Sequence, residues 1–186
     1  MSEEDSYIEV DTAAFSEFIN EFQHESDRAA AILAGAYLDN LLSTILENYL
    51  ISDNKNSHNI LYGNNSPLYT FHSRILCSYG LGLIPTHEFK DLLVIKKIRN
   101  AFAHKQAGLS FSSQSITDQC KKLMIVQELQ NELRKFDWSN SRNLFIYEVA
   151  FLTVSLNFII GRPPDRCIPA KKKHLHFSSK PVTYTK

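Results

Sequence analysis

The chain has 186 residues, of which 44% are hydrophobic and 22% charged, a composition that supports a buried core in one soluble domain. The formal net charge of +0 indicates no class of charged partner, and three widely spaced cysteines without a C-x-x-C pair argue against a disulfide framework or a thiolate zinc site. The acidic N-terminal segment does not resemble a signal peptide. The most apolar run, residues 144–160, is short for a bilayer span and contains Glu148, so we expect a cytoplasmic protein with no membrane partner.

The two ends of the chain carry opposite charge. Residues 1–27 contain acidic side chains but no lysine or arginine, whereas residues 161–186 contain several lysines and arginines and a single acid. Prolines also accumulate in that basic segment. We therefore expect one helical domain over residues 1–160, followed by a basic, proline-containing tail over residues 161–186 that is extended or disordered.

Helical periodicity dominates the first half of the domain. Asp11 or Thr12 can cap a first helix with an apolar stripe of phenylalanine and isoleucine. A second helix, capped by Ser26 or Asp27, runs to about residue 51 and is rich in alanine and leucine. Turn-forming residues predict a loop over residues 52–67.

The second half continues the pattern. A third helix is predicted over residues 69–83, and a fourth begins at Thr86 and continues to residue 104. A fifth covers about 115–136. Residues 143–160 are rich in β-branched and aromatic side chains but lack clean alternation, which favours a buried sixth helix over a strand. The fold class is therefore all-α, a bundle of five to seven helices.

The fourth predicted helix places an arginine on an apolar face. The spacing i, i+3, i+7 and i+10 puts four residues on the same side of a helix, and these are Leu92, Ile95, Arg99 and Phe102. A guanidinium in such a place needs a carboxylate, a phosphate or carbonyl groups as partners. Asp39, in the apolar part of the second helix, is the best candidate partner for a buried arginine, and Arg74 is a second arginine. Asp39, Arg74 and Arg99 thus form a candidate polar network, for binding or for structure alone.

Asn100 follows Arg99 directly, and His104 comes four residues after Asn100. Arginine can hold a phosphodiester bidentately, and histidine can move protons to and from ribose oxygens. Arg99 and His104 point about 140° apart on an ideal helix, so a shared site needs a bend after Asn100 or a second protomer. In the alternative interpretation, His104 only supplies a favourable charge at the helix C-terminus.

Motifs for other chemistry are missing from the sequence. There is no P-loop, no G-x-G-x-x-G and no H-E-x-x-H, so we expect no cofactor and no metal site. His174, His176 and Cys167 could bind a metal, but a solvated tail is the better interpretation.

Several blocks of the sequence resemble, in matching order, the mannitol operon repressor family of bacteria: residues 26–36, 38–39, 66–68, 71–75, 79–84 and 98–104. The resemblance covers roughly residues 12–135. It implies an all-helical, cytoplasmic regulator of transcription of a sugar-alcohol uptake operon, without an evident helix-turn-helix. The Arg99-Asn100 pair with His104 also resembles the R-polar-x3-H signature of the HEPN superfamily of helical dimers, in which many members are metal-independent ribonucleases and others only bind. That likeness implies phosphate contact by Arg99, orientation by Asn100 and acid–base catalysis by His104.

We therefore predict a transcriptional repressor of this family, a homodimer acting through DNA or a protein partner. The alternative is a HEPN-like, metal-independent endoribonuclease or RNA-binding protein that uses Arg99, Asn100 and His104. We prefer the regulator because the resemblance over most of the chain outweighs a six-residue motif.

Overall fold

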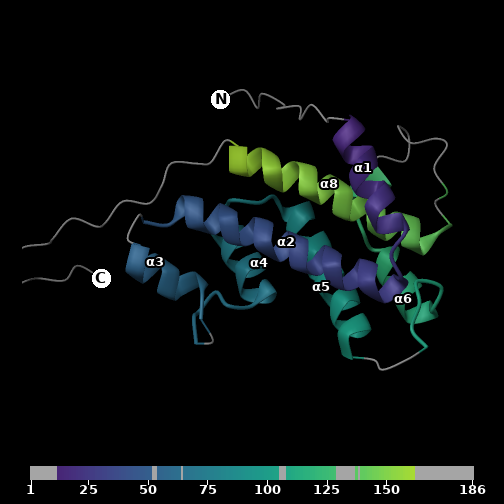
Figure 1. The fold of residues 1–186 in the computed structure, drawn as a ribbon, viewed down its shortest axis with the longest axis horizontal. Coiled ribbons are helices and arrows are strands. Elements are labelled where there is room, and N and C mark those ends of the chain that lie inside the picture. The colour runs from purple at the N-terminus through teal and green to yellow at the C-terminus, as the bar shows by residue number, and fades with distance from the viewer. Residues whose placement is uncertain are drawn as a thin grey trace, which may run out of the picture.

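The computed structural model describes residues 12–51, 54–63, 65–104, 108–128, 137 and 139–161, which contain eight helices and no strand (Figure 1). The predicted all-α fold is thereby confirmed. Apart from Gly161, the predicted basic tail lies outside these residues. The helices are α1 (Thr12–Gln23), α2 (Asp27–Tyr49), α3 (Asn54–Leu61), α4 (Phe71–Gly80), α5 (Thr86–His104), α6 (Gln114–Cys120), α7 (Ile125–Glu128) and α8 (Ser141–Gly161).

The central helix is α2, which packs against α8, α5 and α4 (Figure 1). Ser26 caps it, with the Oγ atom accepting the N–H of Ala29 at 3.2 Å. The first half of its buried face carries small residues, which let neighbouring helices approach closely: Ala30, Ala31, Ala34 and Gly35. The second half carries larger branched residues: Leu38, Leu42, Ile45 and Leu46.

The predicted sixth helix is observed as α8, with Asn140 capping it by accepting the N–H groups of Arg142 and Asn143. Both α2 and α8 are long and apolar enough to cross a membrane, but half of the most apolar window in each is buried inside the bundle. The two helices also pack against each other, so their apolar composition is explained by the core.

The loop expected over residues 52–67 is wrong in its middle, because α3 lies there. Asparagine and serine dominate this segment, yet Leu61 at the end of α3 is fully buried. Next to it, the Tyr62 hydroxyl accepts a hydrogen bond from Ser43 at 3.1 Å and donates to Glu47 at 3.4 Å. Contact with α2 thus stabilises a helix that local propensity does not predict.

The fifth predicted helix is also wrong as one piece. It is interrupted at residues 121–124, giving α6 and the single turn α7, and residues 129–136 lie outside the described part. The cause is a buried carboxylate, Asp91 of α5, which accepts the N–H groups of Met124 at 2.9 Å and Ile125 at 3.2 Å. Asp91, which belongs to α5, therefore caps the start of α7, and the sequence around α7 does not reveal this role. The third predicted helix is shorter than expected, Phe71–Gly80.

Candidate functional site

A groove of about 730 Å³ lies between α2, the start of α4 and α5, and four of the five predicted site residues line it. We call it the basic groove. Its lining residues are Gly35, Ala36, Asp39, Asn40, Tyr69, Thr70, Phe71, His72, Arg74, Lys96, Arg99 and Asn100. The groove brings together α2, α4 and α5, and its volume lies in the range typical of small-molecule sites.

The acid of the groove is neutralised by a buried arginine. Asp39 accepts a hydrogen bond from Nη1 of Arg74 at 2.7 Å, and only 8% of the Arg74 side chain is exposed. The Nη2 atom of Arg74 donates to the carbonyl of Leu61 at 3.1 Å, and its guanidinium lies 6.0 Å from the ring centre of Tyr62. The arginine that pairs with Asp39 is therefore Arg74, and Arg99 contacts other residues.

Arg99 is half-buried, and its aliphatic stem crosses α2 at Gly35. A Cβ built on Gly35 would lie 2.7 Å from Cγ of Arg99, so only glycine admits this close approach. The Nη1 atom of Arg99 donates to Oδ1 of Asn100 at 3.0 Å. Among the described residues, no carboxylate forms an ion pair with Arg99 or with Lys96, which precedes it by one helical turn. Two cations of α5 thus remain uncompensated beside the paired Asp39.

His104 is the predicted site residue that does not line the groove. It is exposed and is the last residue of α5, which continues unbroken through Asn100. The helix break that would turn His104 towards Arg99 is therefore not found within the described chain. A site shared by these two residues would need a second protomer.

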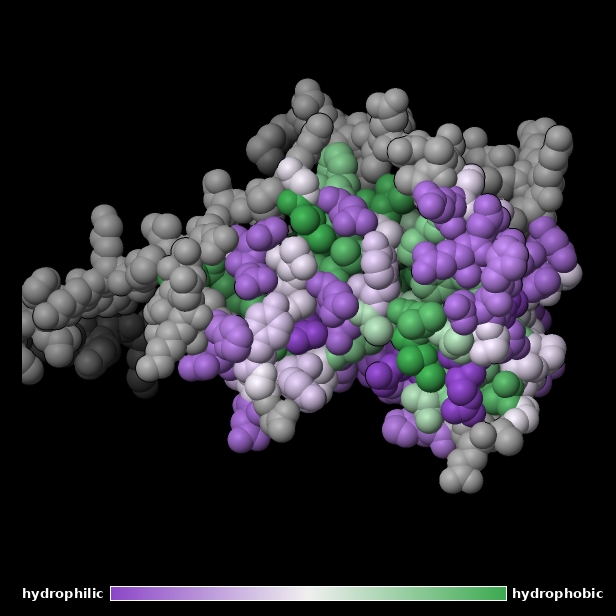
Figure 2. All heavy atoms as spheres, in the orientation of Figure 1, coloured by the Kyte–Doolittle hydropathy of each residue, from purple (hydrophilic) through white to green (hydrophobic). Residues whose placement is uncertain are grey.

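An apolar groove of about 330 Å³ adjoins the basic groove and was not predicted. It lies between α1 and α2, and it shares Ala36 and Asn40 with the basic groove. Leu33 and Tyr37 on its α2 wall are 48% and 41% exposed. The sequence analysis found α2 rich in alanine and leucine, but local sequence does not show which of these side chains stay uncovered. Figure 2, in the orientation of Figure 1, shows hydrophobic residues (green) exposed between hydrophilic ones (purple) on the face towards the viewer. The remaining lining residues are Phe18, Glu21, Phe22 and Glu25.

Comparison with protein families matches residues 28–155 to the mannitol repressor family model. The chain belongs to the mannitol repressor family. Among solved structures, it is similar to the X-ray structure of the MtlR–HPr complex from Escherichia coli, with a TM-score of 0.59 and 16% identity over 78% of this chain and 99% of that chain. At this identity the likeness shows a shared fold. Comparison with curated protein sequences gives no significant match.

Within the mannitol repressor match, α5 and α8 bury three carboxylates that the sequence did not predict as buried. Asp91 and Glu148 are fully buried, and Oε2 of Glu148 accepts the N–H of Val126 at 3.1 Å. Glu88 accepts a hydrogen bond from Ser155, and its other carboxylate oxygen has no hydrogen-bond partner among the described residues. Burial raises the pKa of Glu88 and of Asp91, although the hydrogen bonds that they accept oppose the shift. Asp91 and Glu148 hold α7 in place, whereas Glu88 joins α5 to α8.

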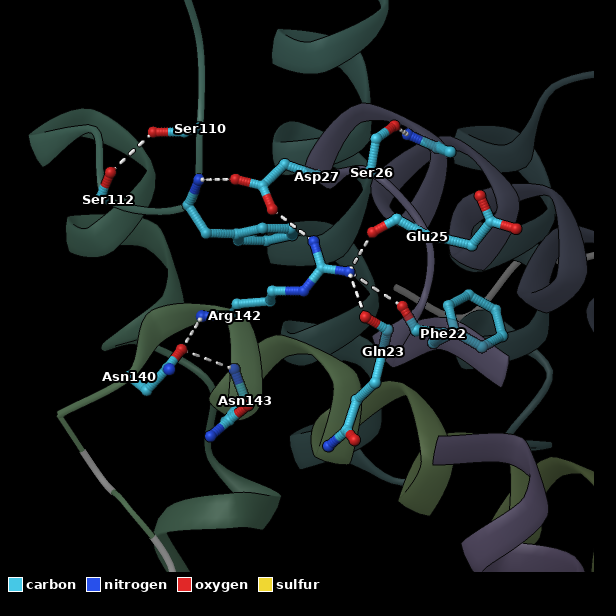
Figure 3. Close-up of polar contacts among 12 residues, drawn as sticks. Phe22, Gln23, Glu25, Ser26, Asp27, Ser110, Ser112, Asn140, Arg142 and Asn143 are labelled. Carbon is cyan, nitrogen blue, oxygen red and sulfur yellow. Dashed lines mark hydrogen bonds and ion pairs between the residues drawn. The ribbon is translucent and has the colours of Figure 1, made fainter. Parts of the chain in front are cut away.

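A second polar cluster joins the start of α8 to the junction of α1 and α2. Figure 3 shows the Arg142 guanidinium between the Asp27 carboxylate and backbone carbonyls at the end of α1. It donates to the carbonyls of Phe22 at 3.0 Å, of Gln23 at 3.3 Å and of Glu25. Asp27 in turn accepts the N–H of Phe111 at 2.8 Å. Arg142 and Asp27 thus join the start of α8 to the junction of α1 and α2 and to Phe111, which is a structural role. In the described residues, no group of three or more histidine, cysteine or acidic side chains is placed to hold a metal ion.

Proposed function

We propose that this member of the mannitol repressor family is a cytoplasmic transcriptional regulator that works by binding a protein partner. The observation that carries the proposal is the apolar groove, where Leu33 and Tyr37 are exposed next to the cations of α5. Exposed aromatic and aliphatic groups beside arginine are typical of protein interfaces. The relative in the Escherichia coli complex is bound to HPr, which supports a protein partner of that kind here.

Charge favours a protein over DNA at this surface. Proteins that bind DNA through its backbone use about 6–10 phosphate contacts. Of the lysines and arginines that line the two grooves, Lys96 and Arg99 are the ones without a carboxylate partner among the described residues. The apolar groove also carries Glu21 and Glu25, which would repel phosphates.

The test is calorimetric titration of the full chain with HPr from the same organism. Leu33→Ala is expected to weaken binding about tenfold, because it removes an anchor from the apolar groove. Leu76→Ala is the matched control: Leu76 is 47% exposed on α4, against 48% for Leu33, and lines neither groove. Equal effects of the two substitutions would contradict docking at the apolar groove. Failure of HPr to bind, together with a salt-sensitive shift of promoter DNA, would contradict the protein-partner proposal itself.

The homodimer is part of this proposal. It is supported by the family resemblance and by exposed apolar residues that line neither groove, Ile60 of α3 and Tyr79 of α4. Sedimentation at micromolar concentration is expected to give about twice the chain mass of 21.3 kDa, and a species of 21.3 kDa alone would contradict it.

The ribonuclease alternative has one observation in its favour, which is that the Arg99 guanidinium forms no ion pair with a carboxylate among the described residues. Single-stranded RNA incubated with the protein in EDTA is expected to stay intact. Cleavage that disappears in His104→Ala would instead favour the ribonuclease, and would place Arg99 and His104 of two protomers in one site.

A further inference from the structure

We propose that the basic groove binds a small phosphomonoester, with Lys96 and Arg99 of α5 as the groups that hold its phosphoryl oxygens. The proposal does not rest on partner docking at the apolar groove, although the two grooves share Ala36 and Asn40 of α2. No comparison assigns a ligand to the groove. The proposal depends on the charges of the groove, on the fixed position of Arg99 and on the helix end that lines one wall.

Lys96 and Arg99 are two positive charges held on one face of α5. They lie three residues apart, where side chains of a helix are neighbours and like charges repel. Both are half-buried in the groove, which strengthens that repulsion relative to bulk water. Since Arg74 already neutralises Asp39, the groove keeps two positive charges. A bound dianion would compensate both.

The guanidinium of Arg99 is positioned before any ligand arrives. Its stem lies against Gly35, and one Nη1 hydrogen bond to Asn100 orients its plane. An arginine has five N–H donors, so most of them remain available for a bidentate contact with phosphoryl oxygens. Fixing the side chain in advance lowers the entropy lost on binding.

The first turn of α4 supplies a third favourable element. Thr70, Phe71 and His72 line the groove, and α4 is ten residues long. The Thr70 hydroxyl accepts the N–H of Ser73 at 3.0 Å and its carbonyl accepts that of Arg74, which leaves the amides of Phe71 and His72 as the donors of this turn. The N-terminal end of a helix favours negative charge.

The class of ligand follows from charge and size. A phosphomonoester carries about −1.5 to −2 at pH 7, which matches the two positive charges of the groove. The groove volume of about 730 Å³ leaves room for an organic part. The Asn40 side-chain amide, which lines the groove, is a group that could hydrogen-bond its hydroxyl groups.

The experiment titrates the full chain with glycerol 3-phosphate, inorganic phosphate, neutral glycerol and a short single-stranded RNA. Glycerol 3-phosphate is expected to bind and to raise the melting temperature, and glycerol is not. Equal binding of inorganic phosphate would support the site with free phosphate as its ligand. Binding of RNA without binding of either phosphate compound would overturn the proposal in favour of a phosphodiester site.

Variants place the site. Arg99→Gln and Lys96→Ala are each expected to weaken glycerol 3-phosphate about tenfold or more, because each removes charged hydrogen bonds. Lys97→Ala is the matched control, since Lys97 is the next residue of α5, is exposed and does not line the groove. Circular dichroism of each variant checks that it remains folded. The proposal is wrong if no phosphate compound binds at millimolar concentration, or if Lys97→Ala weakens binding as much as the two groove variants.

Discussion

Replacing Gly35 by alanine is expected to destabilise the protein even though alanine is the better helix former. Glycine inside a helix costs about 1 kcal/mol relative to alanine, so an unobstructed substitution would be stabilising. At Gly35 the new Cβ would lie 2.7 Å from Cγ and 3.2 Å from Cβ of Arg99. These two atoms lie next to the α5 backbone and cannot swing away as the end of a side chain could.

The expected change in the free energy of unfolding is the difference between the cost of the clash with Arg99 and the gain in helix propensity. Overpacking at a helix crossing costs about 1–3 kcal/mol, so after the gain in helix propensity a net loss of about 1 kcal/mol is expected for Gly35→Ala. In a chain of this length, that corresponds to a fall in melting temperature of about 2–4 °C. Urea denaturation followed by circular dichroism measures the free energy of unfolding directly.

Two further variants isolate the cause. At Gly80 of α4, an added Cβ would meet no atom within 4 Å, so Gly80→Ala should be neutral or stabilising by up to about 1 kcal/mol. In an Arg99→Ala background the nearest clashing atom is gone, and the penalty of Gly35→Ala should shrink by about 1–2 kcal/mol. If Gly35→Ala stabilises as much as Gly80→Ala, then Arg99 does not pack against α2 and the account of the basic groove is wrong.

Three other perturbations test the polar contacts by urea denaturation. Arg142→Ala should lower the free energy of unfolding by about 2 kcal/mol, because it removes charged hydrogen bonds to Asp27 and to the carbonyls ending α1, and Arg142→Lys should recover only part of it. Asp39→Ala should cost about 3 kcal/mol by leaving Arg74 buried and unpaired, whereas a loss below 1 kcal/mol would show that water replaces the carboxylate. Burial raises the pKa of Glu88 in the folded protein above its pKa in the unfolded chain. The contribution of Glu88 to stability is therefore fully present at a pH below the unfolded-state pKa, and it is lost as the pH rises through the folded-state pKa. Glu88→Gln should therefore flatten the fall in stability as the pH rises above the ordinary glutamate pKa of about 4.3, and an unchanged profile would contradict this assignment.

The helices that the sequence predicted best are those with both an end signal and a long apolar surface. Ser26 marks the start of α2, and the run that forms α8 is long, apolar and without clean alternation, which favoured a buried helix. Local sequence could not predict α3, because its stability depends on burying Leu61 against α2. Nor could it predict the break before α7, which the Asp91 carboxylate causes from another helix. Both errors arise where tertiary contacts override propensity.

The candidate site shows the same division. Periodicity placed Arg99 on an inward-facing stripe, and composition singled out Asp39 as an acid within an apolar helix. Which arginine the acid would pair with depends on how α4 and α5 cross α2, and no local pattern contains that angle. The structure pairs Asp39 with Arg74 and leaves Arg99 to Gly35 and Asn100.

The two proposed sites cannot be fully independent, because α2 forms a wall of both. Ala36 and Asn40 line the apolar groove and the basic groove alike, so a partner over Leu33 and Tyr37 would come within a helical turn of the phosphoryl site. Thermodynamic linkage requires any effect of the small ligand on partner affinity to be matched by an equal effect of the partner on ligand affinity. An acidic partner surface would compete for Lys96, whereas an apolar one would shield the groove and strengthen its electrostatics. The sign of that coupling therefore reports the charge of the surface that the proposed partner presents.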